Sequence, residues 1–557
     1  MDMCIFCKVK KIKPSDLSDH FITKEHLDKA RYNTEQCELV KKLQKFVYHK
    51  FATTFVINCA GGCGKTRTVI SSIYNQKIIC LFPTNSAKKA MTKQAKDLGI
   101  DIRQIKFSTL ASFFKYTTDV DENDKSITFY SEPDIKKNVD KYIFIIDEAS
   151  MCGGIYFHLI KHFLLNKTKV IILGDSAQLP TVITDNIIYT DFKFNDLEIK
   201  EEKEILTKNY YGYKFKSEEI CPLFNLETEY KAELTRIMRT ENIPLTKINE
   251  ELRRNVLSNN LRLNTSLIKL YKDMNNSGIE IINKELQSVK FKVNKRENHC
   301  EVFQDEILLE SINQKNSKII CFNANLVDEI NSICKKLKNP DTFNKFDKDD
   351  KIICTSAIFK NDEEGRSIYI CSGDEFIVEN VNIIEKNLPR LINFNKENST
   401  ENNPDKIIEI TTLEDKDYKI KLYELTLLCE KTKYCKEEKT FINEYVEEEF
   451  YVPFNEFEDT KINNWSKKYY DLVKKKKDKE LKIKFFQHKR NLLKSNFRNY
   501  FKLNFCVNAH KCQGLTYDEV FVLVDNLKKI PDRNVYKKLI YTSLSRAKNR
   551  IVMNCMI

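Results

Sequence analysis

The chain has 557 residues, a formal net charge of +13, 41% hydrophobic and 31% charged residues, and 18 scattered cysteines. This length suits three or four domains of roughly 100–200 residues, and the composition excludes a disordered chain or a disulfide framework and favours reduced thiols and a polyanionic partner. No apolar run is long enough to span a membrane, and the N-terminus lacks the apolar core of a signal peptide, so we expect an intracellular protein without a membrane partner.

The first 30 residues carry a spacing typical of zinc ligands, Cys4-x2-Cys7-x12-His20-x5-His26. It would place two thiolates on a knuckle and two imidazoles on consecutive helical turns. The segment resembles a two-Cys, two-His finger of the matrin or U1 type, in which zinc is structural. Two alternatives stay open: ordinary thiols with surface histidines, or Cys37 as a replacement ligand.

A phosphate-binding loop is predicted at NCAGGCGKTRT, residues 58–68, between an apolar strand and a helix. Cys59 stands where such loops have their first glycine, and we expect it to end the strand, with the turn made by the glycines that follow. Lys65 would bind the β- and γ-phosphates of ATP, and Thr66 would ligate Mg²⁺. The residues expected to bind nucleotide here are Gly61, Gly62, Cys63, Gly64, Lys65, Thr66 and Arg67.

Two further apolar stretches end in polar residues that suit the same site. In YIFIIDEASM the apolar run is followed by Asp147, expected to be a second Mg²⁺ ligand, and by Glu148, which would lie beside the attacking water. KVIILGDSAQLPTV ends in Gly174 and Asp175, with Gln178 placed to contact the γ-phosphate or the water. Three strands of this kind predict an α/β fold with a RecA-like parallel sheet that hydrolyses ATP.

The order of these motifs resembles that of superfamily 1 helicases, most closely the 5′-to-3′ branch containing the Pif-type, RecD and Dda enzymes. Residues 33–36 resemble the adenine-reading Q-motif, with Gln36 as its glutamine, and residues 82–90 and 107–114 resemble two motifs that contact a single strand. Leu110 and Ala111 stand where the family often has a histidine. Phe113 and Phe114 can stack on bases or belong to the core.

The second half matches the family's later motifs. Arg239 in LTRIMRT resembles the motif IV arginine, and IICFNANLVDEIN, residues 319–331, resembles the strand and helix that follow. NAHKCQGLTYDEVFVLVD resembles motif V, with Gln513 and Gly514 expected near the nucleotide. IYTSLSRAKNRIVM resembles motif VI, with Arg546 as an arginine finger. The resemblance implies the catalytic set Lys65, Asp147, Glu148, Gln178, Arg239 and Arg546.

The resemblance also implies a domain organisation. We expect a zinc finger at 1–30, a RecA-like domain 1A at 31–235 with a short 1B insertion at about 115–140, a second RecA-like domain 2A at 236–360 and 501–557, and a 2B insertion at 361–500. The 2B strands resemble a small SH3-like β-barrel, with Gly373 and Asp374 in a turn. Residues 467–503 are basic with interleaved aromatics, which fits either a nucleic-acid track or a solvated helical face.

The sequence as a whole predicts an ATP- and Mg²⁺-dependent helicase that moves 5′ to 3′ on DNA in genome replication or repair. Single-stranded and forked DNA would be its substrates, other replication proteins its partners, and heavy use of Lys, Asn and Ile favours an AT-rich viral or mobile genome. One alternative is a superfamily 1 RNA helicase of an RNA virus, some of which have GCGKT loops and N-terminal zinc modules. The other is a non-motor zinc-finger protein that binds nucleic acid and has a vestigial ATPase.

Overall fold

The computed structural model forms two compact units, one containing residues up to Glu329 together with Cys506–Ile557, the other containing Ile330–Phe505. The structure describes residues 20–100, 105–114, 117–120, 127–130, 141–152, 156, 160, 164–165, 167–180, 189–193, 222–240, 242–258, 278–282, 285–293, 296–342, 344–355, 358–361, 367–387, 392–394, 407–409, 419–435, 440–464 and 500–555. Cys4, Cys7, Trp465 and most of the basic run at 467–503 lie outside these residues.

The first sheet of the larger unit brings the predicted strand ends to one edge. Its order is β3-β2-β6-β7-β1-β9, and every neighbouring pair is parallel. The strands are β1 (Thr54–Cys59), β2 (Ile78–Phe82), β3 (Ile105–Thr109), β6 (Ile143–Ile146), β7 (Lys169–Gly174) and β9 (Tyr230–Leu234). Asn58 pairs with Gly174, and Ile146 pairs with Ile172, so the residues after β1, β6 and β7 meet at the carboxyl edge. This confirms the predicted α/β fold with a RecA-like parallel sheet.

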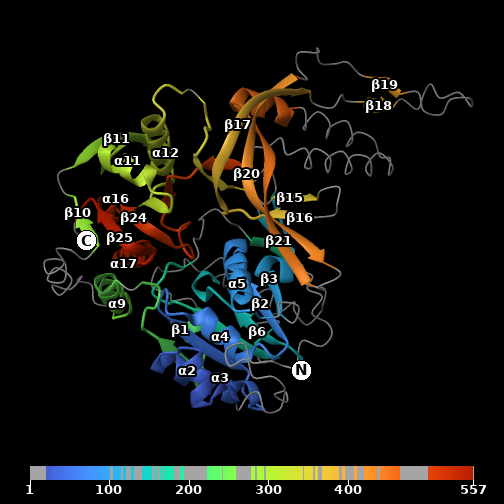
Figure 1. Cartoon of the computed structure of the whole chain (residues 1–557), viewed down its shortest axis with the longest axis vertical. Coiled ribbons are helices and arrows are strands. Elements are labelled where there is room, and N and C mark those ends of the chain that lie inside the picture. Colours follow the sequence, from blue (N-terminus) through green and yellow to red (C-terminus); the bar gives the residue numbers. More distant parts are fainter. Residues whose placement is uncertain are drawn as a thin grey trace, which may run out of the picture. The chain divides into compact units, whose positions relative to one another are not determined.

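Four of the helices next to this sheet begin at a side-chain cap. The helical elements are α2 (Lys24–Lys29), α3 (Thr34–Tyr48), α4 (Lys65–Ile73), α5 (Asn85–Asp97), α6 (Leu110–Phe113), η3 (Ala149–Met151) and η4 (Pro222–Asn225). The capped helices are α2, α3, α5 and α6. Asn33 and Gln36 form a capping box at the start of α3, and Thr84 caps α5. Figure 1 shows α2, α3 and α4 grouped in blue beside β1. Together these elements form the first lobe.

A second parallel sheet in the same unit has the order β10-β25-β24-β13-β23. Its strands are β10 (Ile279–Ile281), β13 (Ser317–Cys321), β23 (Cys506–Asn508), β24 (Tyr517–Val522) and β25 (Ala547–Met553). Between β10 and β13 in the chain lies a separate hairpin of β11 (Leu286–Val293) and β12 (Arg296–Phe303). The helices are α9 (Ile243–Leu257), α11 (Asp305–Asn313), α12 (Ala324–Lys338), α16 (Val524–Lys528) and α17 (Arg533–Leu544). We call α9 to β13 with β23 to β25 the second lobe; α9 and α17 share its hydrophobic core.

The smaller unit differs from the expected SH3-like barrel. Its strands are β14 (Lys351–Cys354), β15 (Ile358–Asn361), β16 (Ser367–Ile370), β17 (Glu375–Asn387), β20 (Lys419–Cys435), β21 (Thr440–Pro453) and β22 (Phe501–Leu503), with a separate pair β18 (Ile392–Phe394) and β19 (Ile407–Glu409). The sheet runs β15-β16-β20-β17-β14-β22, with β21 paired to β20. Within the described strands it does not close, so a barrel is not confirmed, because β17, β20 and β21 extend as long antiparallel strands. The predicted turn at Gly373 and Asp374 is present.

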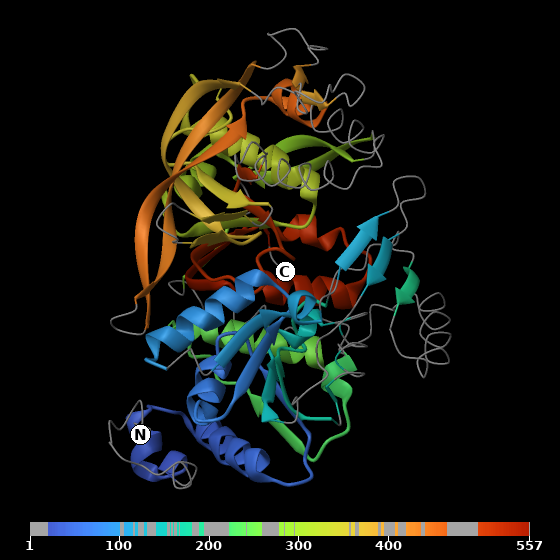
Figure 2. The ribbon, with the colours of Figure 1, turned by 90° about the vertical axis from the view of Figure 1, so that its right-hand side faces the viewer.

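The segment expected to form the 1B insertion contains two antiparallel strands, β4 (Thr117–Val120) and β5 (Ile127–Tyr130). β5 also pairs with β8 (Tyr189–Lys193), and Figure 2 shows these short strands beside one another. Every described cysteine is a free thiol, and all but Cys37 and Cys555 are buried, as expected. Among the helices that the structure describes, none combines the length and the apolar character needed to cross a membrane.

Candidate active site

The phosphate-binding loop connects β1 to α4. Cys59 is the last residue of β1 and is fully buried, which confirms that the strand ends where the first glycine was missing. Gly62 and Gly64 take φ angles of 85° and 77°, values that favour glycine, so the turn is made after the strand. A Cβ on Gly62 would lie 2.7 Å from the Cβ of Arg239, a second reason for glycine there.

Replacing Cys59 with glycine is expected to preserve ATP hydrolysis. The thiol contacts only the protein interior, where it donates to the carbonyl of Ile57, and burial raises its pKa well above the ordinary value. The cost should be about 1–2 kcal/mol of unfolding free energy, from the lost side chain and the added backbone freedom. Steady-state ATPase assays and urea unfolding measure the two quantities; a folded variant without hydrolysis would contradict the interpretation of Cys59 as a strand residue.

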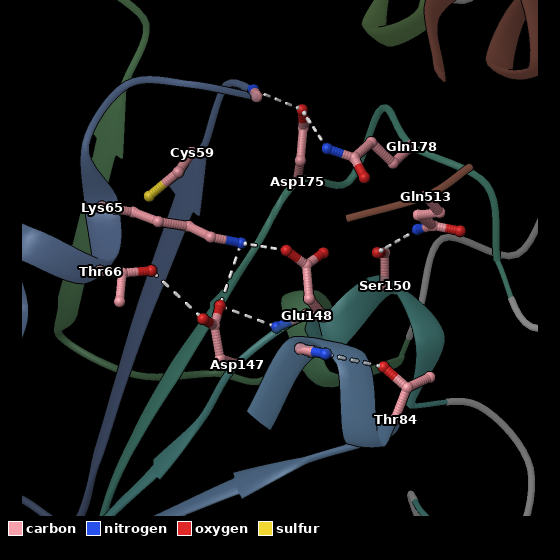
Figure 3. A network of polar contacts seen from close by, with 12 residues as sticks. Cys59, Lys65, Thr66, Thr84, Asp147, Glu148, Ser150, Asp175, Gln178 and Gln513 are labelled. Atoms are coloured by element: carbon pink, nitrogen blue, oxygen red, sulfur yellow. Dashed lines mark hydrogen bonds and ion pairs between the residues drawn. The ribbon is translucent and has the colours of Figure 1, made fainter. Parts of the chain in front are cut away.

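Lys65 lies between the two predicted acids. Its Nζ is 3.0 Å from Asp147 Oδ1 and 3.0 Å from Glu148 Oε1, and the Thr66 hydroxyl is 3.3 Å from Asp147 Oδ2 (Figure 3). Burial alone would lower the pKa of Lys65, but the two carboxylates outweigh it and raise that pKa well above its usual value. Burial would likewise raise the pKa of Glu148, and Lys65 outweighs it and lowers that pKa. The lysine is therefore charged and Glu148 ionised near pH 7.

Two buried acceptor atoms suit an attacking water. Oε2 of Glu148 and Oε1 of Gln178 are buried, and neither has a hydrogen-bond partner among the residues that the structure describes. Glu148 also has left-handed backbone angles, φ 54° and ψ 43°, which are uncommon for a residue other than glycine and cluster at functional sites. Because buried polar atoms are nearly always satisfied, these two oxygens indicate a missing donor such as water.

Arg239 and Arg546 give the site its positive charge. Arg546 is 1% exposed and donates to the carbonyls of Thr542 and Leu515 and to the hydroxyl of Ser545, all neutral groups. Arg239 donates to the carbonyl of Ser545. Burial and then the neighbouring Arg546 lower the pKa of Arg239 to about 10, so the Arg239 guanidinium remains charged near pH 7. In the described part of the chain neither arginine forms an ion pair, which suits an anionic ligand such as a triphosphate.

A junction around Asp175 was not predicted from the sequence. Its Oδ2 accepts hydrogen bonds from the Tyr541 hydroxyl at 2.6 Å and from the Gly61 N–H at 3.0 Å, while its Oδ1 lies 3.2 Å from Arg253 Nε. The Gly61 N–H also donates to the Tyr541 oxygen at 3.1 Å. The junction therefore links the loop of the first lobe to α9 and α17 of the second lobe. No local signal marked it in the sequence, since α9 and α17 each bury other polar residues besides Arg253 and Tyr541.

The remaining predicted nucleotide contacts have protein partners. Gln36 donates to the carbonyl of Cys63 and accepts from Asn33, so it supports the loop from α3. Arg67 donates to the carbonyl of Ala30. Gln513 donates to the Ser150 hydroxyl and the Leu179 carbonyl, and Gly514 takes a φ of 80°. Direct contact of these side chains with nucleotide stays a prediction.

The segments expected to contact single-stranded nucleic acid lie after the β-strands β2, β3 and β23. Thr84 caps α5 directly after β2, and Thr109 caps α6 directly after β3. Phe114 is fully buried and Phe113 packs against Phe114 and Phe144, so these aromatics belong to the core rather than to a stacking surface. His510, after β23, lies 6.0 Å from the Phe322 ring between centroids.

The predicted zinc ligands are described only in part, because Cys4 and Cys7 lie outside the described residues. The rings of His20 and His26 are 5.1 Å apart between centroids, and burial lowers the pKa of both histidines, that of His26 to about 4. Nε2 of His20 is buried without a hydrogen-bond partner in the described chain. The described residues contain no cluster of three or more side chains able to hold a metal ion, so zinc is not confirmed.

Taken together, the site fits a nucleotide with Mg²⁺. The loop offers backbone N–H groups at the start of α4, Lys65 and the arginines supply positive charge, and Thr66 with Asp147 supplies oxygen ligands of the kind Mg²⁺ prefers. A Cβ added to Gly61 would lie 3.4 Å from Gln178 Nε2 and 3.5 Å from Arg546 Nη2, so the groups predicted to act on the γ-phosphate converge on this loop. The arrangement can bind a triphosphate and direct a water at it.

Sequence comparisons match both lobes. A family model described as an AAA domain matches residues 45–184, and one described as a UvrD-like helicase C-terminal domain matches residues 504–553. The uncharacterized protein R530 of Acanthamoeba polyphaga mimivirus is 27% identical over 168 residues, covering 27% of this chain and 34% of that protein, about a third of its length. The two matched segments contain Lys65, both carboxylates, Gln178 and Arg546, and they support an ATP-dependent DNA helicase.

Solved structures with similar folds include the Pif1 helicase from Bacteroides in complex with ADP-AlF3 and ssDNA, at 16% identity and a TM-score of 0.44, covering 93% of this chain and 92% of that one. The Pif1 helicase from Candida albicans is 14% identical with a TM-score of 0.41, covering 94% and 95% of the two chains.

Proposed function

We propose that this chain is an ATP-driven motor that moves 5′ to 3′ along single-stranded DNA and unwinds duplex DNA. One observation supports it above all: Arg546 of the second lobe lies against the phosphate-binding loop of the first lobe, near Gly61. A hydrolysis site that needs residues from both lobes makes their contacts depend on the nucleotide, and that dependence can drive movement.

In the proposed hydrolysis step, Lys65 and the loop N–H groups hold the phosphates of ATP. Thr66 and Asp147 would hold Mg²⁺, which would offset the charge of the phosphate oxygens. Glu148, which is ionised, accepts a proton from the attacking water, and Gln178 orients that water through its free carbonyl oxygen. Arg546 and Arg239 stabilise the negative charge that spreads over the transferred phosphoryl group.

Replacing Arg546 with alanine is expected to lower the ATPase rate by about 10³–10⁵-fold, the range measured for arginine fingers. The matched control is Lys548→Ala, which removes an exposed cation two positions away. Nucleotide binding, followed with a fluorescent ATP analogue, should persist in both variants. A loss of only a few fold in Arg546→Ala would contradict the assignment.

The single-stranded DNA is proposed to run over the segments that follow β2 and β3 in the first lobe and β23 in the second lobe. Backbone amides, hydroxyls and lysines there, such as Thr84, Thr109 and Lys511, can hold phosphates without reading sequence. These contacts reach only the sugar-phosphate backbone of the nucleic acid. The proposal of DNA as the substrate and of 5′-to-3′ movement therefore rests on the resemblance to the helicase branch named above.

The test is ATPase stimulation by single-stranded DNA and by RNA, together with unwinding of duplexes that carry a 5′ or a 3′ tail. We expect stimulation by DNA and unwinding of the 5′-tailed duplex. Unwinding restricted to 3′ tails would refute the direction, and stimulation restricted to RNA would favour an RNA helicase. Absence of stimulation by either polymer would leave a nucleic-acid-binding protein with a vestigial ATPase.

A structural zinc ion is proposed at the N-terminus, held by Cys4, Cys7, His20 and His26. The support is the ligand spacing and the buried, unsatisfied Nε2 of His20. Protein purified without chelator should contain one zinc per chain, and replacement of both cysteines by serine should remove it. Zinc that is absent from the wild type, or retained by the double variant, would count against these ligands.

For the biological role, we propose replication or repair of DNA, with other replication proteins as partners. The likeness to a mimivirus protein over 168 residues agrees with a viral or mobile genome. The heavy use of Lys, Asn and Ile, which is typical of AT-rich genomes, also favours this origin.

A further inference from the structure

A cavity of about 340 Å³ lies in the second lobe, apart from the nucleotide site. Its lining includes Phe291 and Asn298 of the β11–β12 hairpin, Phe322 and Asn323 after β13, and Lys529 and Ile530 after α16. The volume falls in the range of pockets that bind small organic groups. None of these residues belongs to the ATP-hydrolysing machinery.

The cavity lies where ligands of parallel sheets usually bind. Phe322 and Asn323 directly follow β13, and α16 directly follows β24, so one wall is built at the carboxyl ends of two parallel strands. The opposite wall is the hairpin, in which Phe291 and Asn298 are direct cross-strand partners and therefore face the same side. The described residues that line it all come from the second lobe and the segments that adjoin its strands.

The walls are fixed by hydrogen bonds between the elements. The N–H of Phe322 donates to Asn526 Oδ1 at 2.8 Å, which ties the end of β13 to α16. Lys529 Nζ donates to the carbonyl of His299 at 3.0 Å, which ties the segment after α16 to the hairpin. The pocket is thus formed without a ligand to organise it, which reduces the ordering cost of binding.

The cavity adjoins the segment predicted to contact a single strand. The Phe322 ring lies 6.0 Å from the His510 ring, and the amide of Asn508 donates to the carbonyl of Phe322. Asn508 and His510 belong to the turn after β23. A nucleic-acid strand that runs over this turn would therefore pass close to Phe322, one of the residues that line the cavity.

The lining chemistry selects among ligands. Two phenylalanine rings offer flat apolar surfaces, the asparagine side chains supply both donors and acceptors, and the exposed Lys529 adds a positive charge at the rim. An aliphatic ligand would leave the amides unused, and a compact anion would leave the rings unused. A nucleobase matches all three, because it has a π face, a mixed hydrogen-bonding edge and a phosphate attached through the sugar.

We propose that this cavity binds one base of the single strand, turned out of the track as the strand passes the second lobe. The inference rests on the proposed function, since it needs a strand in contact with the turn after β23. Binding of one base per strand would fix the register of the nucleic acid on the second lobe. Contacts with the phosphates alone would not fix a register.

The test uses a set of otherwise identical single-stranded DNAs in which one abasic site is moved along the strand. A short duplex at one end fixes the register, and dissociation constants are measured by fluorescence anisotropy without nucleotide. For the wild type we expect one position, or two adjacent ones, at which the missing base weakens binding by about 5- to 150-fold, the range for loss of one stacked base.

The key variant is Phe322→Leu, which keeps apolar volume in the wall but removes the ring. It should bind all the abasic strands alike, with an affinity for the intact strand near that of the wild type bound to the sensitive abasic strand. Lys290→Ala is the control, because Lys290 is an exposed residue of the same hairpin that does not line the cavity. It should retain the position-dependent loss.

Two results would overturn the inference while leaving the proposed function intact: equal binding of all abasic strands by a wild type whose ATPase is stimulated by DNA, or a position-dependent loss that persists in folded Phe322→Leu. Failure of the wild type to bind any single strand would instead overturn the proposed function, and this inference with it.

Discussion

Replacing Lys65 with alanine is expected to reduce ATP hydrolysis by about 10²–10³-fold or more, since it removes the main cationic contact to the β- and γ-phosphates. The structure adds a second effect. Lys65 is the cation between the buried Asp147 and the largely buried Glu148, and its removal leaves two carboxylates close together without compensation. Breaking a buried ion pair from one side costs about 3–5 kcal/mol, so the variant should also unfold at a lower urea concentration.

The two effects of Lys65→Ala can be separated. Single-turnover hydrolysis measures the chemical step, and urea unfolding with and without Mg²⁺ measures the repulsion, because a bound divalent cation would restore part of the lost compensation. The control is Lys88→Ala, which removes a lysine of α5 in the same lobe. Hydrolysis near the wild-type rate in Lys65→Ala would refute the active site.

Replacing Asp175 with alanine is expected to be strongly destabilising, at about 3–5 kcal/mol. The carboxylate is fully buried and accepts hydrogen bonds from Gly61, Tyr541, Arg253 and the N–H of Ala177. Its loss would leave Arg253 buried with only the half-exposed Glu233 as an ionic partner. The loop would also lose one of the two acceptors of the Gly61 N–H, the other being the Tyr541 oxygen.

Tyr541→Phe is the graded comparison for Asp175→Ala. It removes one hydroxyl that bridges Asp175 and Gly61 and leaves the ion pair, so we expect a loss of about 1.5–3 kcal/mol, as for a hydrogen bond to a charged group. Urea unfolding of both variants, followed by intrinsic fluorescence, gives the comparison. Equal effects would mean that the hydroxyl carries most of the junction, and an effect below about 1 kcal/mol for Asp175→Ala would contradict its central place.

The structure brings the predicted nucleotide-site residues close together because they follow buried strands. Lys65, Asp147 and Gln178 each come soon after a run of apolar residues, and the carboxyl ends of parallel strands share one edge. Cys59 was predicted to be the last residue of a buried strand, and the structure confirms it as the end of β1.

The junction around Asp175 could not be predicted in the same way. Tyr541 and Asp175 are 366 positions apart, and their contact depends on the packing of two lobes that no local pattern encodes. The barrel is not confirmed for a related reason: alternating apolar residues indicate strands, but strand length and partner decide whether a sheet closes, and β20 and β21 form a long pair. The domain limits at 30, 235, 360 and 500 stay predictions.

The long strand β21 has a consequence for the protein in concentrated solution. Within the described residues its one strand partner is β20, so it is an edge strand, the kind of strand through which a second chain can pair. Its exposed positions alternate as Tyr445, Glu447 and Glu449, with Tyr445 65% exposed. Two copies that approached through this edge would bring like charges together, and such pairs are destabilising in a sheet. The glutamates of β21 therefore oppose edge-to-edge aggregation in an otherwise basic protein.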